Sequence, residues 1–263
     1  MEKQTFYYKE LSESTYSIPL PPDEPMTNIM VLDIETVPNP YMECFTAAFA
    51  DQLKAPTAED APKNMSKPET IARWIEKEAE KRQEVYPQEF AKMALDVDYA
   101  QIDSIAWRMV DRRGGNFEIV LLTGGDVVEE RNCLRQFWNF IRQHTTPRLC
   151  GYNILGFDLP ILMRRSWVLG VPPVRYKARR YSDEQVIDVM QLLYGWGQYP
   201  LHKSNKYRSL KKVCEMFGIE NPLPGLHGGL YAQMDDVTKS LYNLNDVRMT
   251  WELARRMEGV YWN

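Results

Sequence analysis

The sequence contains few of the side chains that bind zinc or carry out nucleophilic catalysis. Its three histidines and four cysteines are widely separated, and no two cysteines form a CxxC pair. A zinc site or a serine–histidine catalytic site is difficult to assemble from so few residues. We therefore expect free thiols in a reducing compartment, as in a cytoplasmic protein.

Long apolar segments are also absent. No uncharged apolar run reaches the roughly 18 residues that a membrane-spanning helix requires. The N-terminal residues lack the basic and then apolar pattern of a secretion signal. The sequence therefore predicts no membrane partner.

The composition is that of a folded protein with an uneven charge distribution. Of the 263 residues, 44% are apolar, which is enough to bury a core. The net charge of −4 argues against indiscriminate binding of nucleic acids. Residues 164–212 nevertheless carry eleven basic and three acidic side chains, a net charge of +8. This window indicates either a groove for a phosphate backbone, with binding that weakens steeply with salt, or solvated helix faces.

The stretch from Met30 to Thr36 predicts a buried strand that ends in two acids. Residues 29–32 form an apolar run typical of a central strand in a sheet covered on both faces. Side chains alternate along a strand, so Asp33 and Glu35 point to the same face. Two adjacent carboxylates repel each other unless a cation lies between them, and oxygen ligands suit Mg²⁺ or Mn²⁺. A strand end exposed to solvent is the alternative interpretation.

The apolar periodicity predicts an α/β protein whose mixed sheet, an antiparallel hairpin plus parallel strands, is flanked by helices. Residues 1–27 form a predicted N-terminal arm, and residues 28–263 form a single domain with a helical insertion at 41–96. In that insertion, residues 69–86 have helical spacing. The other expected strands are 102–110, 117–122, 149–152 and 186–189, and a turn at 113–116 joins the first two of them. The other expected helices are 126–144, 159–169, 210–217 and 236–257.

A second group of candidate residues lies where a strand leads into a helix. Asp158 stands at the position of a helix N-cap, and capping alone would account for it. Alternatively, this junction is a ligand site, as strand ends are in other α/β sheets. Asn153 would then hydrogen-bond a nucleotide or a phosphate, and Phe157 would pack against a base. Asp188, near the end of the expected strand 186–189, is either an acid that supports the site or a plain strand-end acid.

The last helix carries a third group. Tyr242 and Asp246 are four residues apart and share one face of the helix. Apolar residues surround that face, so Asp246 would be partly buried, which is costly without a cation or a donor. The alternative is an acid at the rim with Tyr242 packed beside it.

In this order, Asp33-x-Glu35, Asn153-x3-Phe157-Asp158 and Tyr242-x3-Asp246 resemble the three motifs of the DEDD 3′–5′ exonucleases, and the tyrosine is typical of their tyrosine subclass. The segments DIET, FDLPIL, SLKKVCEMFGI and YNLNDV are most similar to the proofreading exonuclease domain of family B DNA polymerases and its stand-alone relatives. The resemblance covers about residues 28–257 and implies an RNase H-like fold. Family members often carry an Asp-Gly element before the third motif, where this chain has GLHGGL at 225–230.

The resemblance implies a metal-dependent hydrolase that removes nucleotides from the 3′ end of single-stranded DNA by two-metal-ion chemistry. Its implied cofactors are two divalent cations, Mg²⁺ or Mn²⁺, and its implied partners are a DNA 3′ end and proteins of replication or repair. Tyr242 would orient the attacking water. The implied metal ligands are Asp33, Glu35, Asp158 and Asp246, and the implied substrate-binding residues are Thr36, Asn153 and Phe157.

Two other interpretations are open. An RNA 3′–5′ exonuclease of the RNase D type would use the same acids, since recognition of the 2′-hydroxyl can depend on a single loop. A non-catalytic nucleic-acid-binding or polymerase-accessory protein could also retain the fold, because a fold alone does not fix a function. The presence of all four acids favours an active enzyme.

Overall fold

The computed structural model describes residues 28–39, 54–110, 117–144, 146–198 and 207–258. The predicted N-terminal arm, the predicted turn at 113–116 and part of the predicted insertion lie outside the described residues. The strands are β1 (Ile29–Pro38), β2 (Ala100–Val110), β3 (Phe117–Leu122), β4 (Arg148–Gly151) and β5 (Val186–Asp188). The α-helices are α2 (Pro68–Lys92), α3 (Val127–Gln143), α4 (Asp158–Val168), α5 (Val189–Leu193), α6 (Leu210–Met216) and α7 (Asp236–Arg255), and the 3-10 turns are η1 (Ala58–Asp60), η2 (Met93–Leu95), η3 (Gly195–Gly197) and η4 (Gly228–Gln233).

The five strands form one sheet in the order β3-β2-β1-β4-β5. β2 pairs antiparallel with β3, whereas β4 pairs parallel with both β1 and β5. β1 is central, as its apolar run predicts, and Met30 and Val31 on its two faces are fully buried. The predicted RNase H-like mixed sheet is therefore confirmed.

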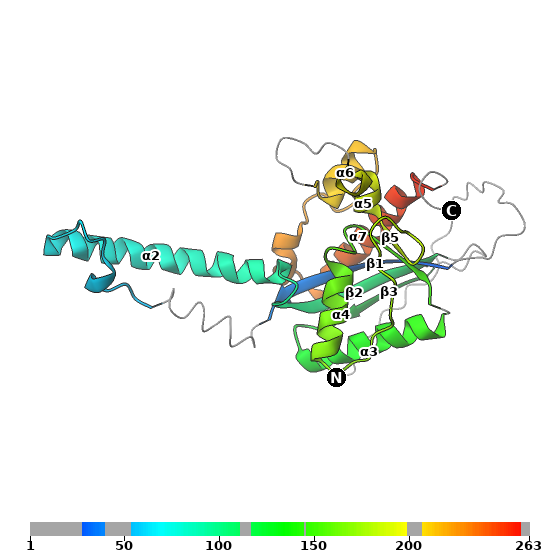
Figure 1. The fold of residues 1–263 in the computed structure, drawn as a ribbon, viewed down its shortest axis with the longest axis horizontal. Helices are drawn as coiled ribbons and strands as arrows, with labels where there is room; N and C mark the ends of the chain where they lie inside the picture. The colour runs from blue at the N-terminus through cyan, green and yellow to red at the C-terminus, as the bar shows by residue number, and fades with distance from the viewer. Residues whose placement is uncertain (1–27, 40–53, 111–116, 145, 199–206, 259–263) are drawn as a thin grey trace, which may run out of the picture. The chain divides into compact units, whose positions relative to one another are not determined.

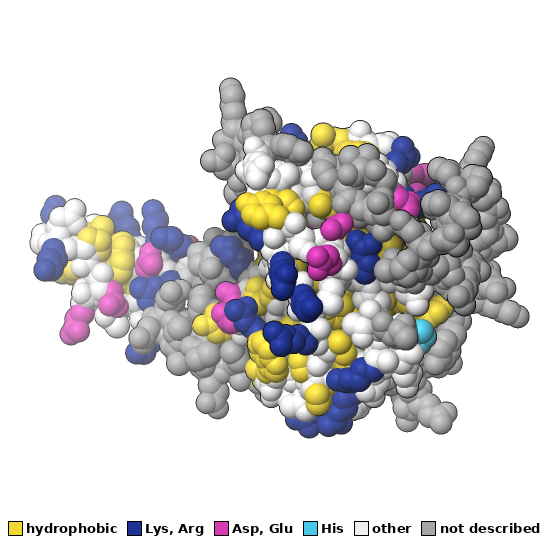
Figure 2. Space-filling model, turned by 45° about the vertical axis from the view of Figure 1, so that its right-hand side comes forward, with side chains coloured by type: hydrophobic (Ala, Val, Ile, Leu, Met, Phe, Trp, Pro, Cys, Tyr) yellow, Lys and Arg dark blue, Asp and Glu magenta, His cyan; other side chains and the backbone are white. Residues whose placement is uncertain are grey.

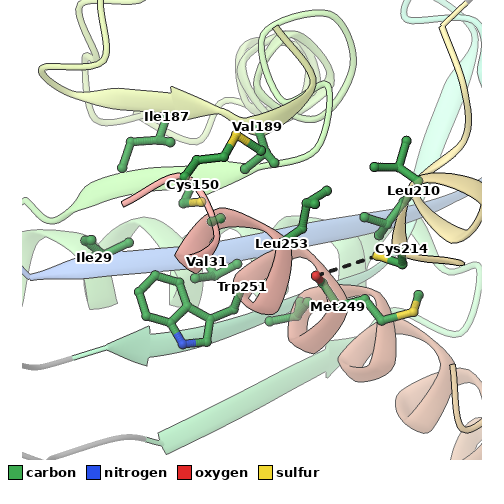
Figure 3. Packing of buried hydrophobic residues seen from close by; sticks show 14 of the residues in the cluster. Ile29, Val31, Cys150, Ile187, Val189, Leu210, Cys214, Met249, Trp251 and Leu253 are labelled. Atoms are coloured by element: carbon green, nitrogen blue, oxygen red, sulfur yellow. Dashed lines mark hydrogen bonds between the residues drawn. The ribbon is translucent and has the colours of Figure 1, made fainter. Parts of the chain in front are cut away.

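Helices cover both faces of this sheet (Figure 1). α3 and α4 lie on one face, where the indole Nε1 of Trp138 donates to the hydroxyl of Ser166 at 2.7 Å. α5, α6 and α7 lie on the other face, where Ile29 and Val31 of β1 join one apolar cluster with Leu253 of α7 (Figure 3). Because side chains of β1 and β4 pack against the helices on both faces of the sheet, the ends of these two strands are held in fixed positions.

A buried ion pair fixes α4 to its neighbours. The guanidinium of Arg165 donates to both carboxylate oxygens of Glu130, at 2.7 and 2.6 Å, and both side chains are buried. Glu130 of α3 also accepts a hydrogen bond from the backbone N–H of Ile102 in β2, at 3.0 Å. Such bidentate pairs define the orientation of the helices that carry them.

α7 is buried on nearly every side, from Ser240 to Ala254. It contacts β3 and β4 of the sheet as well as α5 and α6. A helix enclosed in this way contains apolar residues around its whole circumference, so polar residues within it need specific partners. Its Tyr242 and Asp246 are therefore placed inside the protein and not at a solvated rim.

The chain divides into two compact units, residues 36–101 and the remainder. The helix predicted at 69–86 is confirmed, and it extends over Pro68–Lys92 as α2. The description of residues 28–263 as one domain with an insertion at 41–96 stays a prediction. In the described part of the chain, no helix is long and apolar enough to cross a membrane.

Candidate active site

β1 directs two acids toward α7. Ile29 and Val31 pack in the cluster that also contains Trp251 and Leu253 of α7 (Figure 3). Because side chains alternate along a strand, the next odd-numbered residues continue the same face. β1 therefore delivers the carboxylates of Asp33 and Glu35 to the side of the sheet where α7 lies.

Three carboxylates meet at this place. One oxygen from each of Asp33, Glu35 and Asp246 lies within 4.8 Å of the other two. Asp246 is buried, and Asp33 and Glu35 are half-buried. The tertiary structure thus brings together acids that are separated by more than two hundred residues in the chain.

Asp158 approaches the cluster from α4 in a way that the sequence did not predict. The expected N-cap is wrong: Phe157 occupies the N-cap position of α4, and Asp158 is the first helical residue. Oδ1 of Asp158 instead accepts a hydrogen bond from the backbone N–H of Ile34, at 3.1 Å. Since Ile34 lies between Asp33 and Glu35, this bond places the Asp158 carboxylate beside the pair.

Burial and mutual repulsion make these acids hard to ionise. Desolvation, followed by the charges of Glu35, Asp158 and Asp246, raises the pKa of Asp33 well above its ordinary value. Desolvation and then the charge of Asp246 raise the pKa of Glu35 to about 8. Burial also raises the pKa of Asp158 to about 7, although the hydrogen bond from Ile34 opposes the rise. A nearby cation would reverse these shifts, because it stabilises the ionised carboxylates.

Two oxygens of the cluster have no hydrogen-bond partner among the described residues. Oδ2 of Asp33 and Oδ1 of Asp246 are buried, and neither accepts a hydrogen bond from this part of the chain. A buried carboxylate oxygen without a donor is costly, and such atoms call for a specific explanation. Hard, oxygen-only donors at this separation fit Mg²⁺ or Mn²⁺, and they do not fit zinc, which prefers nitrogen and sulfur.

Lys211 is a member of the site that the sequence analysis missed. Its ammonium lies 3.8 Å from Oδ1 of Asp246 and donates to the hydroxyl of Tyr242 at 2.8 Å. It also donates to the carbonyl of Leu226 at 3.1 Å. The GLHGGL segment, residues 225–230, therefore contacts the site through this lysine. Burial raises the pKa of Asp246 to about 6, and the charge of Lys211 opposes the rise. In the sequence, Lys211 was only one of the eleven cations of the basic window, and no local pattern distinguishes it.

Asp188 holds the loop that carries Asn153. Its Oδ1 accepts from the backbone N–H of Asn153 at 3.2 Å, and its Oδ2 accepts from that of Leu155 at 3.0 Å. Oδ1 also accepts from the N–H of Gln191 at 3.1 Å, so Asp188 caps α5. Val189 therefore begins α5. The sequence analysis had placed Val189 in the strand, and that prediction is wrong.

Asn153, Phe157 and Thr36 lie close to the acids along the chain. Asn153 has a φ of 63°, a left-handed conformation that asparagine tolerates better than most residues. The side chains of Asn153 and Phe157 are half-buried. Thr36 follows Glu35 in β1, and its hydroxyl donates to the backbone carbonyl of Ala94. Contact of these three residues with a substrate stays a prediction.

Residues 92–251 match the family described as predicted 3′–5′ exonucleases related to the exonuclease domain of PolB. The chain belongs to this family. Its family is thus one of 3′–5′ exonucleases, which are hydrolases of phosphodiester bonds. The match begins after β1, so the placement of Asp33 and Glu35 beside Asp246 comes from the structure alone.

The exonuclease is also similar to known polymerases. It is 35% identical to the DNA polymerase delta catalytic subunit of Caenorhabditis elegans over 60 residues, which are 23% of this chain and 6% of that protein. The family B DNA polymerase of Pyrobaculum calidifontis has a similar fold, with a TM-score of 0.51 and 19% identity over 92% of this chain and 25% of the polymerase. Exonuclease I of E. coli, in complex with a dT13 oligonucleotide, aligns over 89% of this chain and 41% of its own, with 10% identity and a TM-score of 0.45. The exonuclease thus spans only a small part of either polymerase.

Proposed function

We propose that the exonuclease removes nucleotides from the 3′ end of single-stranded DNA and that it uses two divalent cations. The observation that carries this proposal is the approach of three carboxylates from β1 and α7 to within 4.8 Å of one another. The family gives the reaction class. Similarity to a DNA polymerase subunit favours DNA over RNA as the substrate.

The residues that would hold the cations are the four acids of the cluster. Asp33 and Asp246 offer buried oxygens that accept no hydrogen bond from the described residues, Glu35 completes the trio, and Asp158 adjoins it through Ile34. When bound, Mg²⁺ or Mn²⁺ supplies the acidification of a water molecule and the stabilisation of charge on the departing 3′-oxygen. The protein's part is to keep these buried and half-buried carboxylates in fixed positions, where electrostatic interactions are stronger than in bulk water.

Tyr242 would orient the attacking water, as in the tyrosine subclass. Desolvation, with a contribution from the charge of Asp246, raises the pKa of its phenol, so the phenol keeps its proton at neutral pH. It therefore acts as a hydrogen-bond donor and not as a general base. Lys211 donates to the phenol oxygen, which fixes the direction in which the phenol proton can point.

The terminal nucleotides would contact the loop after β4. The ring of Phe157 would stack against a base, an interaction of about 1–3 kcal/mol that is largely independent of sequence. The side-chain amide of Asn153 would hydrogen-bond the terminal nucleotide, and Thr36 would contact it from β1. Asp188 supports this arrangement, because it fixes the backbone of the loop.

The proposal is tested by incubating a 5′-labelled single strand of DNA with and without Mg²⁺ or Mn²⁺. We expect a ladder that shortens from the 3′ end only when metal is present. The Asp33→Ala protein should leave the strand intact under the same conditions. Equal degradation by this variant would contradict the assignment of the site, and release of the labelled 5′ nucleotide without a ladder would contradict the polarity. Competition between labelled DNA and RNA strands decides the sugar preference, and faster loss of the RNA would identify an RNA 3′–5′ exonuclease.

Replacing Lys211 by Met should lower kcat by about ten-fold or more, because hydrogen bonds to charged groups contribute roughly 1.5–3 kcal/mol. Met keeps the length of the side chain but removes the donor to Tyr242. Lys212→Met is the matched control, since the ammonium of Lys212 pairs with Glu215 on an exposed helix face. Single-turnover rates measure the effect, and equal rates for the two variants would show that Lys211 does not position Tyr242.

A further inference from the structure

A groove runs along the outer side of α4, beginning at the loop that carries the site residues Asn153 and Phe157. It has a volume of about 330 Å³, and its apolar lining includes Leu155, Leu159, Met163 and Trp167. Leu159, Met163 and Trp167 follow one another at intervals of four, so they form a row on one side of α4, and Leu155 lies in the loop that precedes the helix. The opposite side of α4 carries buried residues such as Asp158. One helix thus links the site to the groove.

The lining of the groove includes an exposed aromatic side chain. Trp167 is 63% exposed, whereas Tyr176, which also lines the groove, is buried. Trp167 lies about 12 Å along the helix from Leu159, at a rise of 1.5 Å per residue. An exposed indole at the far end of an apolar groove provides a flat surface on which a ring can stack.

Basic side chains are frequent in the segments that line the groove. Residues 159–182 contain six basic side chains and no acid. Arg165 is buried and paired with Glu130. The other five are exposed, namely Arg164, Arg175, Lys177, Arg179 and Arg180. On the face of the molecule in Figure 2, basic side chains (dark blue) lie beside hydrophobic ones (yellow), with some acidic ones (magenta) between them. Apolar surface bordered by cations fits a polyanion with apolar rings better than it fits an apolar peptide.

We propose that the α4 groove binds the bases of the substrate strand on the 5′ side of the nucleotide being removed. Trp167 stacks on one of these bases, and the surrounding cations contact the phosphates. Because every base has a flat face, the contact does not depend on sequence. This inference rests on the proposed function, since it assigns the groove to the same single strand.

The proposal predicts an effect that depends on substrate length. Trp167→Ala should raise KM for single-stranded dT12 roughly ten-fold and leave kcat unchanged, because only bases far from the reacting phosphate lose a contact. The dinucleotide dT2 is too short to reach Trp167 and should be cleaved at the wild-type rate. Trp167→Phe, which keeps an aromatic ring, should recover most of the affinity for dT12.

Val168→Ala is the matched control, because Val168 is 71% exposed on the same helix and does not line the groove. If Trp167→Ala behaves like Val168→Ala on dT12, the groove has another occupant and the inference is wrong. An equal loss on dT2 and dT12 would also overturn it, because it would indicate damage to the site or the fold. Failure of the wild-type protein to shorten either strand would instead reject the proposed function.

Discussion

Replacing Asp246 by Asn is expected to lower kcat on single-stranded DNA by about a thousand-fold or more, since a metal ligand contributes several kcal/mol to transition-state stabilisation. Asn keeps the shape of the side chain but removes its charge. Lys211 keeps two other acceptors, the hydroxyl of Tyr242 and the carbonyl of Leu226, so the packing around α7 should survive. Tyr242→Phe should cost only about ten-fold, because one hydrogen bond contributes roughly 0.5–1.5 kcal/mol.

The comparison has a control on the same helix. Glu252 of α7 is exposed and pairs with Arg255, so Glu252→Gln should leave kcat unchanged. Steady-state rates at saturating Mg²⁺ or Mn²⁺, together with thermal melts, separate catalytic from folding effects. A larger loss for Tyr242→Phe than for Asp246→Asn would mean that the tyrosine, and not the bound metal, carries the chemistry.

The metal-free protein is expected to lose stability as the pH rises from about 5 to 8, and divalent cations should restore it. Burial raises the pKa of Glu35 from 4.5 to about 8, so between these values the folded protein holds a proton that the unfolded chain releases. The folded state thus binds more protons than the unfolded state, and its stability falls with increasing pH. Asp158 and Asp246, with pKa values raised to about 7 and about 6, act in the same direction.

Thermal melts with chelator and with Mn²⁺ at pH 5 and pH 8 measure this linkage. At about 100 times its Kd, Mn²⁺ should raise the Tm by roughly 5–10 °C at pH 8, and by less at pH 5, where protons compete with the metal. In the presence of chelator at pH 8, Asp33→Asn should melt above the wild type, because it removes one of the repelling charges. A metal-independent Tm, or a less stable Asp33→Asn protein, would argue against a cation site at these acids.

Much of the fold was predictable because its signals are local. The helix expected at 126–144 is α3, Val127–Gln143, and its start follows from Asp126, whose side chain accepts hydrogen bonds from two backbone N–H groups. The strands expected at 102–110 and 117–122 pair as a hairpin. α5 was not predicted, because five residues are too few to show a helical period.

The candidate site was predictable only in part. The alternation of side chains along β1 places Asp33 and Glu35 on one face, and helical spacing places Tyr242 one turn before Asp246. The preference of acids for helix N-caps led to a wrong prediction for Asp158, because an acid at a helix start is most often a cap. Its actual partner, the N–H of Ile34, lies 124 residues away in the chain.

The sequence by itself therefore determined most of the elements, the shared face of Asp33 and Glu35, the shared face of Tyr242 and Asp246, and the family that the motifs resemble. These properties depend on periods of two and 3.6 residues, which can be read along the chain. Only the tertiary structure decided that Lys211 joins the acids and that Asp188 fixes the Asn153 loop. It also decided that the outer side of α4 forms a groove. Such contacts depend on the order of strands in the sheet and on helix packing, which no short stretch of sequence encodes.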